Sequence, residues 1–292
     1  MSPQFLQSLF EQRLVILATM HRKEEAIAPL IEPALGVKVQ VPAHFNTDVF
    51  GTFTREVDRP GTQLEAARLK ALKALEITGE SLAIASEGTF GPHPLFPYLP
   101  CNRELVILID LKHDLEIVGE EFSTTTNYSH QRVSSLAEAE HFAHKAGFPQ
   151  HGLVVIPDPQ TPGNGTGNGK MFKGITSREA LQEAVTFALQ TSPQVHLETD
   201  MRALYNPTRM QTIAKATQNL IQKLNHCCPQ CGWPGFDLLK SEPGLPCGWC
   251  GASTSLIQTE IYGCKKCDFT QEIHFPEGIE TADPGQCAYC NP

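Results

Sequence analysis

Eight of the ten cysteines form four Cys-x-x-Cys pairs near the end of the 292-residue chain. This spacing is typical of zinc knuckles, because two thiolates three residues apart can bind the same tetrahedral ion. Four thiolates fill every position of such an ion, so the site is closed and structural rather than catalytic. The sequence therefore predicts two structural Zn²⁺ ions. The predicted ligands are Cys228, Cys231, Cys247, Cys250, Cys264, Cys267, Cys287 and Cys290.

The spacing of the pairs leaves their combination open. Fifteen residues separate the first two pairs, and nineteen separate the last two. We expect sequential pairs to share an ion, and an interleaved arrangement is the alternative. Cys227 stands directly beside a predicted ligand and is expected to be spare.

Two carboxylates earlier in the chain form a second candidate site. Glu65 stands in the first turn of a predicted helix, and Glu87 follows a short apolar strand. In α/β sheets, ligands bind at the carboxyl ends of strands. Two carboxylates at this place can hold Mg²⁺ against a phosphate chain, although from this stretch alone we favour a purely structural role for both. In that role Glu65 only caps its helix and Glu87 is only a loop residue.

The predicted elements around these carboxylates alternate between strand and helix, which indicates an α/β domain. Thr62 begins the helix that carries Glu65, and Gly79 ends it. The later elements include a β-hairpin that turns near 112–114. The predicted strands are Arg13–Thr19, Val37–Val41, Ser81–Ser86, Glu104–Asp110, Leu115–Thr126, Leu153–Ile156 and Gln194–Leu197. The predicted helices are Phe5–Glu11, Glu24–Ala34, Thr62–Ile77, Leu136–Ala146, Ser177–Leu189 and a long one from Asn206-Pro207 to about Leu224.

Two segments carry ambiguous signals. Pro157–Lys170 is rich in glycine but lacks the Gly-Lys-Ser/Thr ending of a P-loop, so a flexible connection is expected. Asp200, Arg202 and Arg209 are close in sequence and either face a ligand or surround a solvated helix entry. We favour the solvated helix entry.

Composition excludes several classes of protein. The net charge of −9 argues against nucleic acid and anionic membranes as partners. From residue 226 onward there are three lysines, no arginine and eight acidic residues, which also disfavours phosphate backbones. No signal peptide or apolar stretch of membrane-spanning length is evident. We expect a cytoplasmic protein with an α/β domain over 1–225 and a double zinc ribbon over 226–292.

Residues 13–90 resemble the inosine triphosphate pyrophosphatase superfamily, including its non-canonical purine phosphatase branch. That family ends a strand in an Ala-Thr-x-Asn turn that holds phosphate, and here Ala18-Thr19-Met20-His21 stands at the equivalent place. Its Thr-x-x-Glu helix is matched by Thr62, Glu65 and Lys70, although Ala66 replaces an asparagine. Glu87-Gly88 resembles the Glu-Gly-Gly turn of the purine phosphatase branch.

The resemblance implies a mixed sheet and Mg²⁺-dependent hydrolysis of a nucleotide. By this resemblance Glu65 and Glu87 bind Mg²⁺ and activate water, while Lys23 and Lys70 contact phosphates together with the turn at Thr19 and His21. The combination with cysteine-rich ribbons is also similar to a bacterial family of unassigned function.

Two functions follow from these patterns. One is a Mg²⁺-dependent hydrolase of a nucleoside triphosphate or related phosphorylated small molecule. The other is a non-enzymatic adaptor that binds a ligand in its α/β domain and a protein partner through its zinc ribbons.

Overall fold

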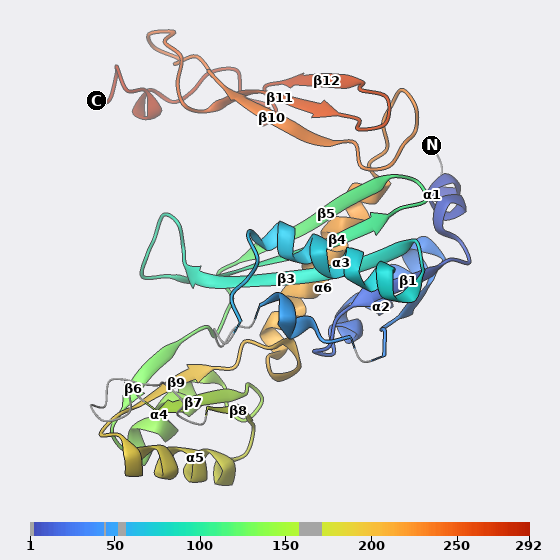
Figure 1. The fold of residues 1–292 in the computed structure, drawn as a ribbon. Helices are drawn as coiled ribbons and strands as arrows, with labels where there is room; N and C mark the ends of the chain where they lie inside the picture. Colours follow the sequence, from blue (N-terminus) through green and yellow to red (C-terminus); the bar gives the residue numbers. More distant parts are fainter. Residues whose placement is uncertain (1–2, 44, 52–56, 158–170) are drawn as a thin grey trace. The chain divides into compact units, whose positions relative to one another are not determined.

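The computed structural model describes residues 3–43, 45–51, 57–157 and 171–292. The chain divides into two compact units, one formed by Phe10–Leu220 and the other by Met1–Leu9 together with Ile221–Pro292. Both units combine helices and strands, so the expected mixed α/β class is confirmed (Figure 1). Residues 163–169 of the glycine-rich segment lie outside the described residues.

The first sheet of the larger unit has five strands in the order β2-β1-β3-β4-β5. β2 and β3 both run parallel to β1, whereas β3, β4 and β5 form an antiparallel meander. The chain therefore passes to one side of β1 and then to the other, which makes β1 the topological switch point of the sheet. The strands are β1 Leu14–Ala18, β2 Lys38–Gln40, β3 Leu82–Pro92, β4 Pro100–Asp110 and β5 Leu115–Ser123.

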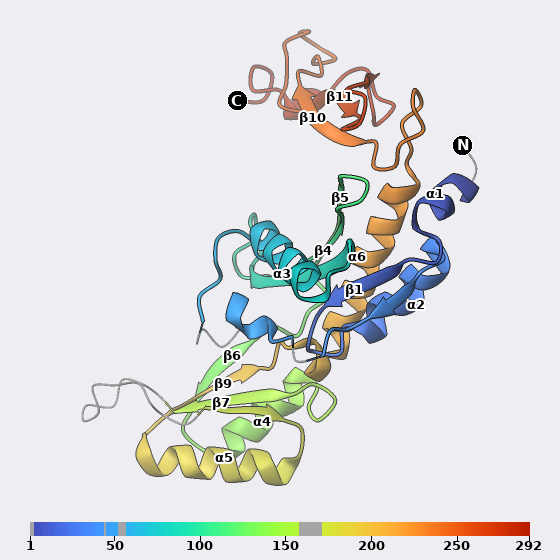
Figure 2. The same ribbon diagram turned by 45° about the vertical axis from the view of Figure 1, so that its right-hand side comes forward.

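The helices α2 (Glu24–Leu35) and α3 (Gln63–Thr78) connect these strands, and the short 3₁₀ helix η1 (Thr47–Phe50) lies between them (Figure 2). α3 begins with the predicted capping box, in which Thr62 and Glu65 exchange hydrogen bonds. It ends at Gly79, whose φ of 71° is easily adopted only without a side chain. Its alanine-rich face packs on the sheet. The predicted start and end of this helix are confirmed.

The strand that carries Glu87 is longer than predicted. We expected it to end at Ser86, but β3 continues to Pro92 and Glu87 pairs with Leu105 inside the ladder. The prediction is wrong because Gly88 and Thr89 do not form a turn: β4 supplies backbone partners along the whole segment. The irregular loop is confined to the residues between Pro92 and Pro100.

The second sheet of the larger unit has four antiparallel strands in the order β6-β9-β7-β8. Helices α4 and α5 share one hydrophobic core with it (Figure 1). In β9, Val195 and Leu197 enter this core, so His196 and Glu198 lie on the opposite face. The elements are β6 His130–Val133, α4 Leu136–Ala146, β7 Leu153–Pro157, β8 Phe172–Ile175, α5 Arg178–Thr191 and β9 Val195–Thr199.

The short helix η2 (Ala203–Tyr205) leads into α6 (Pro207–Asn225), which starts at the predicted proline. α6 packs against β5 at Gly119, where a Cβ atom would collide with the backbone of Ala216 and Leu220. This close approach requires glycine and holds the middle of α6 beside the first sheet.

The smaller unit contains α1 (Pro3–Phe10, of which residues 3–9 belong to it) and a three-stranded antiparallel sheet in the order β10-β11-β12. Its strands are β10 Asp237–Pro243, β11 Ile257–Gly263 and β12 Thr270–His274, followed by the short η3 Pro284–Gln286. All five residues of β12 are exposed. Across both units, none of the described helices combines the length and apolar character needed to cross a membrane.

Candidate binding cavity and metal centres

The eight predicted cysteine ligands form two groups in the smaller unit. Within each group the sulfur atoms all lie within 4.8 Å of one another. One group contains the first and third Cys-x-x-Cys pairs, and the other contains the second and fourth. The groups are Cys228, Cys231, Cys264 and Cys267, and Cys247, Cys250, Cys287 and Cys290.

This interleaved arrangement corrects the sequential pairing that we expected. The reason is the antiparallel register of β10 and β11, in which Asp237 pairs with Gly263. The first cysteine pair precedes β10 and the third follows β11, so the hairpin brings these ends together. The second pair follows β10 at the other end of the hairpin. At that end Cys247 forms a β-bridge with Ala282. Ala282 lies shortly before Cys287, so this bridge brings the fourth pair close to the second.

The donor chemistry of both groups fits a metal ion such as Zn²⁺. Burial opposes ionisation of Cys228, but backbone N–H groups of Cys231 and Gln230 lower the pKa of its thiol to about 7. The hydrogen bond with Cys250, together with burial and the other thiols of the group, raises the pKa of Cys290 to about 12. Four crowded thiols therefore cannot all ionise without a cation between them. Cys227 belongs to neither group.

The larger unit encloses a cavity of about 450 Å³ between its two sheets. One wall is the switch point of the first sheet, with Thr19, His21 and Lys23 after β1 and with Glu87 on β3. Lys70 reaches the same cavity from α3. The structure thus brings together five of the six predicted residues of the α/β site.

Lys23 is the most unusual group of this wall. Its side chain is buried, and its Nζ donates to the carbonyl oxygen and to the hydroxyl of Ser86, both at 3.0 Å. Burial and the nearby charge of Arg209 lower the pKa of Lys23 to about 7, although Glu87 and Glu104 oppose the shift. Lys23 can therefore exchange a proton near neutral pH.

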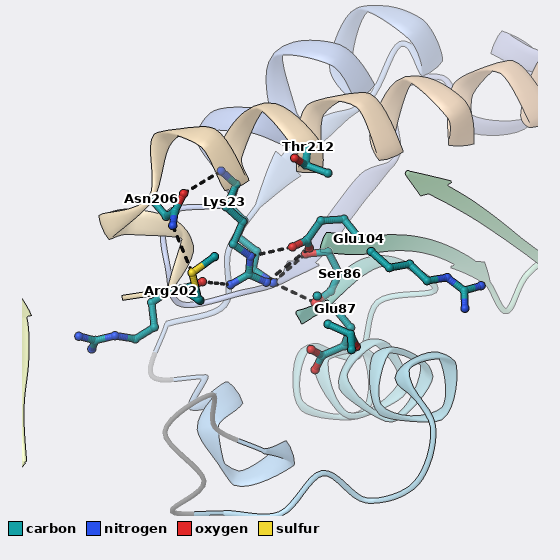
Figure 3. Close-up of polar contacts among 12 residues, drawn as sticks. Lys23, Ser86, Glu87, Glu104, Arg202, Asn206 and Thr212 are labelled. Atoms are coloured by element: carbon teal, nitrogen blue, oxygen red, sulfur yellow. Dashed lines mark hydrogen bonds and ion pairs between the residues drawn. The ribbon is translucent and has the colours of Figure 1, made fainter. Parts of the chain in front are cut away.

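Glu87 is buried and lies between two cations. Lys70 forms an ion pair with its Oε1, and the Arg59 guanidinium lies 3.7 Å from its Oε2. Burial alone would raise the pKa of Glu87, but the positive charges of Lys70 and Lys23 outweigh it and hold the pKa below its ordinary value. Figure 3 shows Glu87 directed toward α3, with Ser86 beside it on the same strand. The carboxylate is therefore held ionised inside the protein.

Glu65 does not join this site. It is exposed, it accepts the backbone N–H of Thr62 at 2.7 Å, and it is not among the residues that line the cavity. Among the described residues, the only groups of three or more possible metal ligands are the two cysteine groups. The described part of the cavity thus holds no preformed carboxylate cage for Mg²⁺.

The segment from Asp200 to Arg209 is not the solvated helix entry that we favoured. Asp200 is buried, and Arg202 lies 2.7 Å from its Oδ2 at the cavity wall. Arg209 is also buried and donates from Nε to Glu104 of β4 at 2.8 Å. Gly88 leaves room for this pair, because a Cβ atom there would collide with both side chains. Asp200 and Arg202 agree better with the other prediction, in which these charged residues face a ligand.

The second wall was not predicted from the sequence. It comes from the face of the second sheet opposite its hydrophobic core, where His130, Lys173, His196 and Glu198 line the cavity. His196 Nε2 and Glu198 Oε1 lie 2.8 Å apart. The alternation of Val195, His196, Leu197 and Glu198 was the available signal, since a half-buried strand presents polar residues on one face.

A family model matches residues 70–292, which is most of the chain. This chain belongs to the family described as domain of unknown function (DUF6671). The expected membership of a family of unassigned function is therefore confirmed. The DUF6671 match includes Glu87, the second wall of the cavity and all eight cysteine ligands, and it begins at Lys70. No curated protein matches the chain.

Proposed function

We propose that the larger unit binds a nucleoside triphosphate or a related phosphorylated small molecule and hydrolyses it with Mg²⁺. The observation that carries the proposal is the pair of buried lysines, Lys23 and Lys70, beside the buried carboxylate of Glu87 at the switch point. Open α/β sheets bind ligands at this point, and lysines there suit phosphate oxygens.

The charge of the cavity supports an anionic ligand. Among the described residues of its lining, five side chains are basic and four are acidic, which is a formal excess of one positive charge with histidines neutral, in a protein of net charge −9. The basic residues are Lys23, Arg59, Lys70, Lys173 and Arg202, and the acidic residues are Asp58, Glu87, Glu198 and Asp200. Phosphate is a suitable partner, because desolvated cations favour a charge that neutralises them.

The aromatic lining supports a planar group on the same ligand. Phe90, Tyr128 and His130 all line the cavity, and the Tyr128 ring lies 5.8 Å from Phe90 and 6.3 Å from His130. Aromatic faces stack on heterocyclic bases. A cavity of about 450 Å³ is within the usual range for small-molecule sites.

The catalytic step requires one carboxylate at the metal and one water. Mg²⁺ commonly enters with substrate phosphates and takes only one or two protein carboxylates. In this proposal Glu87 would be a ligand of the ion, which would supply Lewis-acid activation of the phosphate and the water. Lys70 would move its contact from Glu87 to a phosphate oxygen. Thr19, His21 and Lys23 contact the phosphates from the turn after β1.

The test is release of phosphate or pyrophosphate from a panel of standard and deaminated nucleoside triphosphates with Mg²⁺. Glu87→Gln is expected to lower turnover at least ~100-fold while the protein stays folded. Glu65→Gln is the matched control, because it changes an exposed carboxylate outside the lining. An equal loss of turnover in both variants would show that Glu65 and Glu87 act together, as the sequence predicts. Full activity of Glu87→Gln would exclude a catalytic role for Glu87.

The second candidate is binding without turnover. Glu87 already has two cationic partners and no described carboxylate cluster beside it, which favours a cavity that holds an anion without reacting with it. In that case calorimetry would detect nucleotide binding that Lys70→Met weakens, while no member of the panel releases phosphate. The zinc ribbons would then supply the protein contacts of an adaptor.

A further inference from the structure

The two cysteine groups of the smaller unit differ in what they present to solvent. The knuckles of the first group enclose Pro229-Gln230 and Lys265-Lys266. The knuckles of the second enclose Gly248-Trp249 and Ala288-Tyr289. Trp249 and Tyr289 thus occupy the same position in two knuckles that share one site. They are 80% and 79% exposed, which is uncommon for rings of this size.

The exposure of these rings follows from the knuckle itself. The cysteines before and after each ring turn their sulfur atoms toward the shared site. The backbone N–H of Trp249 donates to the sulfur of Cys247 at 3.5 Å, which fixes the turn. The intervening side chain is left outside, so a pair of aromatic rings is displayed by a rigid scaffold rather than by a loop.

Beside the first cysteine group, an aromatic ring is covered by a cation. The ammonium of Lys266 lies 4.8 Å from the centroid of the Trp233 ring, within the range of a cation–π contact. Lys266 occupies the knuckle position that corresponds to Trp249 and Tyr289 in the second group. In the part of the chain that the structure describes, no lysine or arginine is recorded over either of those two rings.

The charges around the second group complement a cation. Glu277, Glu280 and Asp283 are exposed in the segment that leads to Cys287. Ala282 of this segment accepts a hydrogen bond from the N–H of Gly248 at 3.0 Å, so Glu280 and Asp283 lie next to the Trp249 knuckle. Four thiolates with one divalent ion add a formal charge of about −2.

We propose that the Trp249–Tyr289 surface docks a basic segment of a partner protein. Lysine or arginine side chains of that segment lie over the two rings and pair with Glu280 and Asp283, as Lys266 lies over Trp233 within the chain. The surface lies wholly in the smaller unit and contributes no residue to the cavity, so this interaction is independent of the proposed hydrolysis.

The test uses the full-length, zinc-loaded protein and a fluorescent peptide of alternating glycine and arginine with four arginines. Binding is measured by anisotropy at low salt, where screening is weak. The variant Trp249→Ala/Tyr289→Ala is expected to weaken binding about tenfold, because each exposed cation–π contact contributes a factor of roughly two to five. Tyr98→Ala is the matched control, since Tyr98 is 86% exposed in the larger unit.

A second variant, Glu280→Lys/Asp283→Lys, keeps both rings and reverses the local charge, and it is expected to abolish binding. If Trp249→Ala/Tyr289→Ala also lowers the zinc content, this second variant still tests whether the surface binds the peptide. A peptide with citrulline in place of arginine is expected not to bind. Unchanged affinity in both variants, equal binding of the citrulline peptide, or preference for a single-stranded oligonucleotide over the peptide would each overturn the proposal.

Discussion

The two units place their charged and metal-binding groups in opposite ways. The larger unit buries ionised side chains completely, as with Glu104 and Arg209, neither of which has exposed side-chain surface. In the described part of the smaller unit, one hydrophobic cluster consists of Cys228, Phe236 and Cys264 with partly buried neighbours, and a few further residues such as Leu245 and Ala282 are buried. A large core can compensate for the desolvation of an ion pair, whereas a small one cannot and depends on metal ligands instead.

The same contrast extends to recognition. The larger unit gathers its candidate ligand groups around a cavity, where Lys23, Lys70 and Glu87 are buried. The smaller unit displays Trp249 and Tyr289 on its surface, because its interior is occupied by the cysteine groups. Burial suits a small molecule that can be enclosed, and display suits a partner protein.

Metal removal should have the greatest effect of all, and it should destabilise one unit but not the other. A chelator is expected to unfold the sheet β10–β11–β12 and leave the larger unit intact, because structural zinc sites contribute ~10–16 kcal/mol of apparent binding free energy. Hydrogen exchange on the full chain checks this, with loss of protection confined to residues 226–292. Equal loss in Phe10–Leu220 would show that the units do not differ in this way.

The interleaved pairing can be tested by counting metal ions. The double variant Cys228→Ser/Cys264→Ser removes two ligands from one group, so one ion per chain is expected to remain. Sequential pairing would instead damage both groups and leave none. Cys227→Ser is the control and should keep two ions, as measured by elemental analysis.

The buried ion pair should have the next largest effect. Glu104→Gln leaves Arg209 charged and without its carboxylate partner, and it is expected to lower the free energy of unfolding of the larger unit by about 3–5 kcal/mol. Chemical denaturation of the zinc-loaded protein measures it. A second substitution, Arg209→Met, should recover part of the loss, and additive losses would argue against the pairing.

The pH dependence of anion binding should depend on Lys23. A bound phosphate favours the ammonium form, so affinity is expected to be highest below pH 7 and to fall by up to about tenfold per pH unit above it. The charges of Arg209, Lys70, Glu87 and Glu104 act on this group in the free protein. Calorimetry with inorganic triphosphate from pH 6 to 9 measures the slope.

The control for this titration is Lys23→Arg, whose charge does not titrate in this range. Ionisation of the triphosphate contributes equally to the pH dependence of affinity in both proteins, so it drops out of the difference between their slopes. In the free protein, the unfolded chain binds the extra proton between pH 7 and 10.5, so stability should rise with pH there. If the wild-type protein and Lys23→Arg had the same slope, Lys23 would not contact the bound anion.

The smallest expected effect concerns the cap of α3. Thr62→Ala removes the hydroxyl that accepts the N–H of Glu65 at 3.2 Å and should cost about 1 kcal/mol of stability. Because the cap lies outside the cavity lining, nucleotide turnover should not change. A loss of turnover without unfolding would connect the cap to the site after all.

Features that depend on neighbouring residues could be predicted from the amino-acid sequence alone. Thr62, Glu65 and Gly79 set the ends of α3, and the Cys-x-x-Cys spacing identified the eight cysteines of the two groups, because caps and knuckles are local structures. The lysines at positions 23 and 70 were likewise predicted as phosphate contacts from short motifs, and both reach one cavity.

Contacts between residues that are distant in the sequence depend on the fold and could not be predicted in this way. The register of β10 and β11 set the interleaved cysteine groups, and β4 extended β3 beyond Glu87. Arg209 meets Glu104 across 105 residues of sequence, and a second sheet supplies one wall of the cavity. Strand register and the packing of separate elements are long-range properties, so no spacing within one segment reveals them.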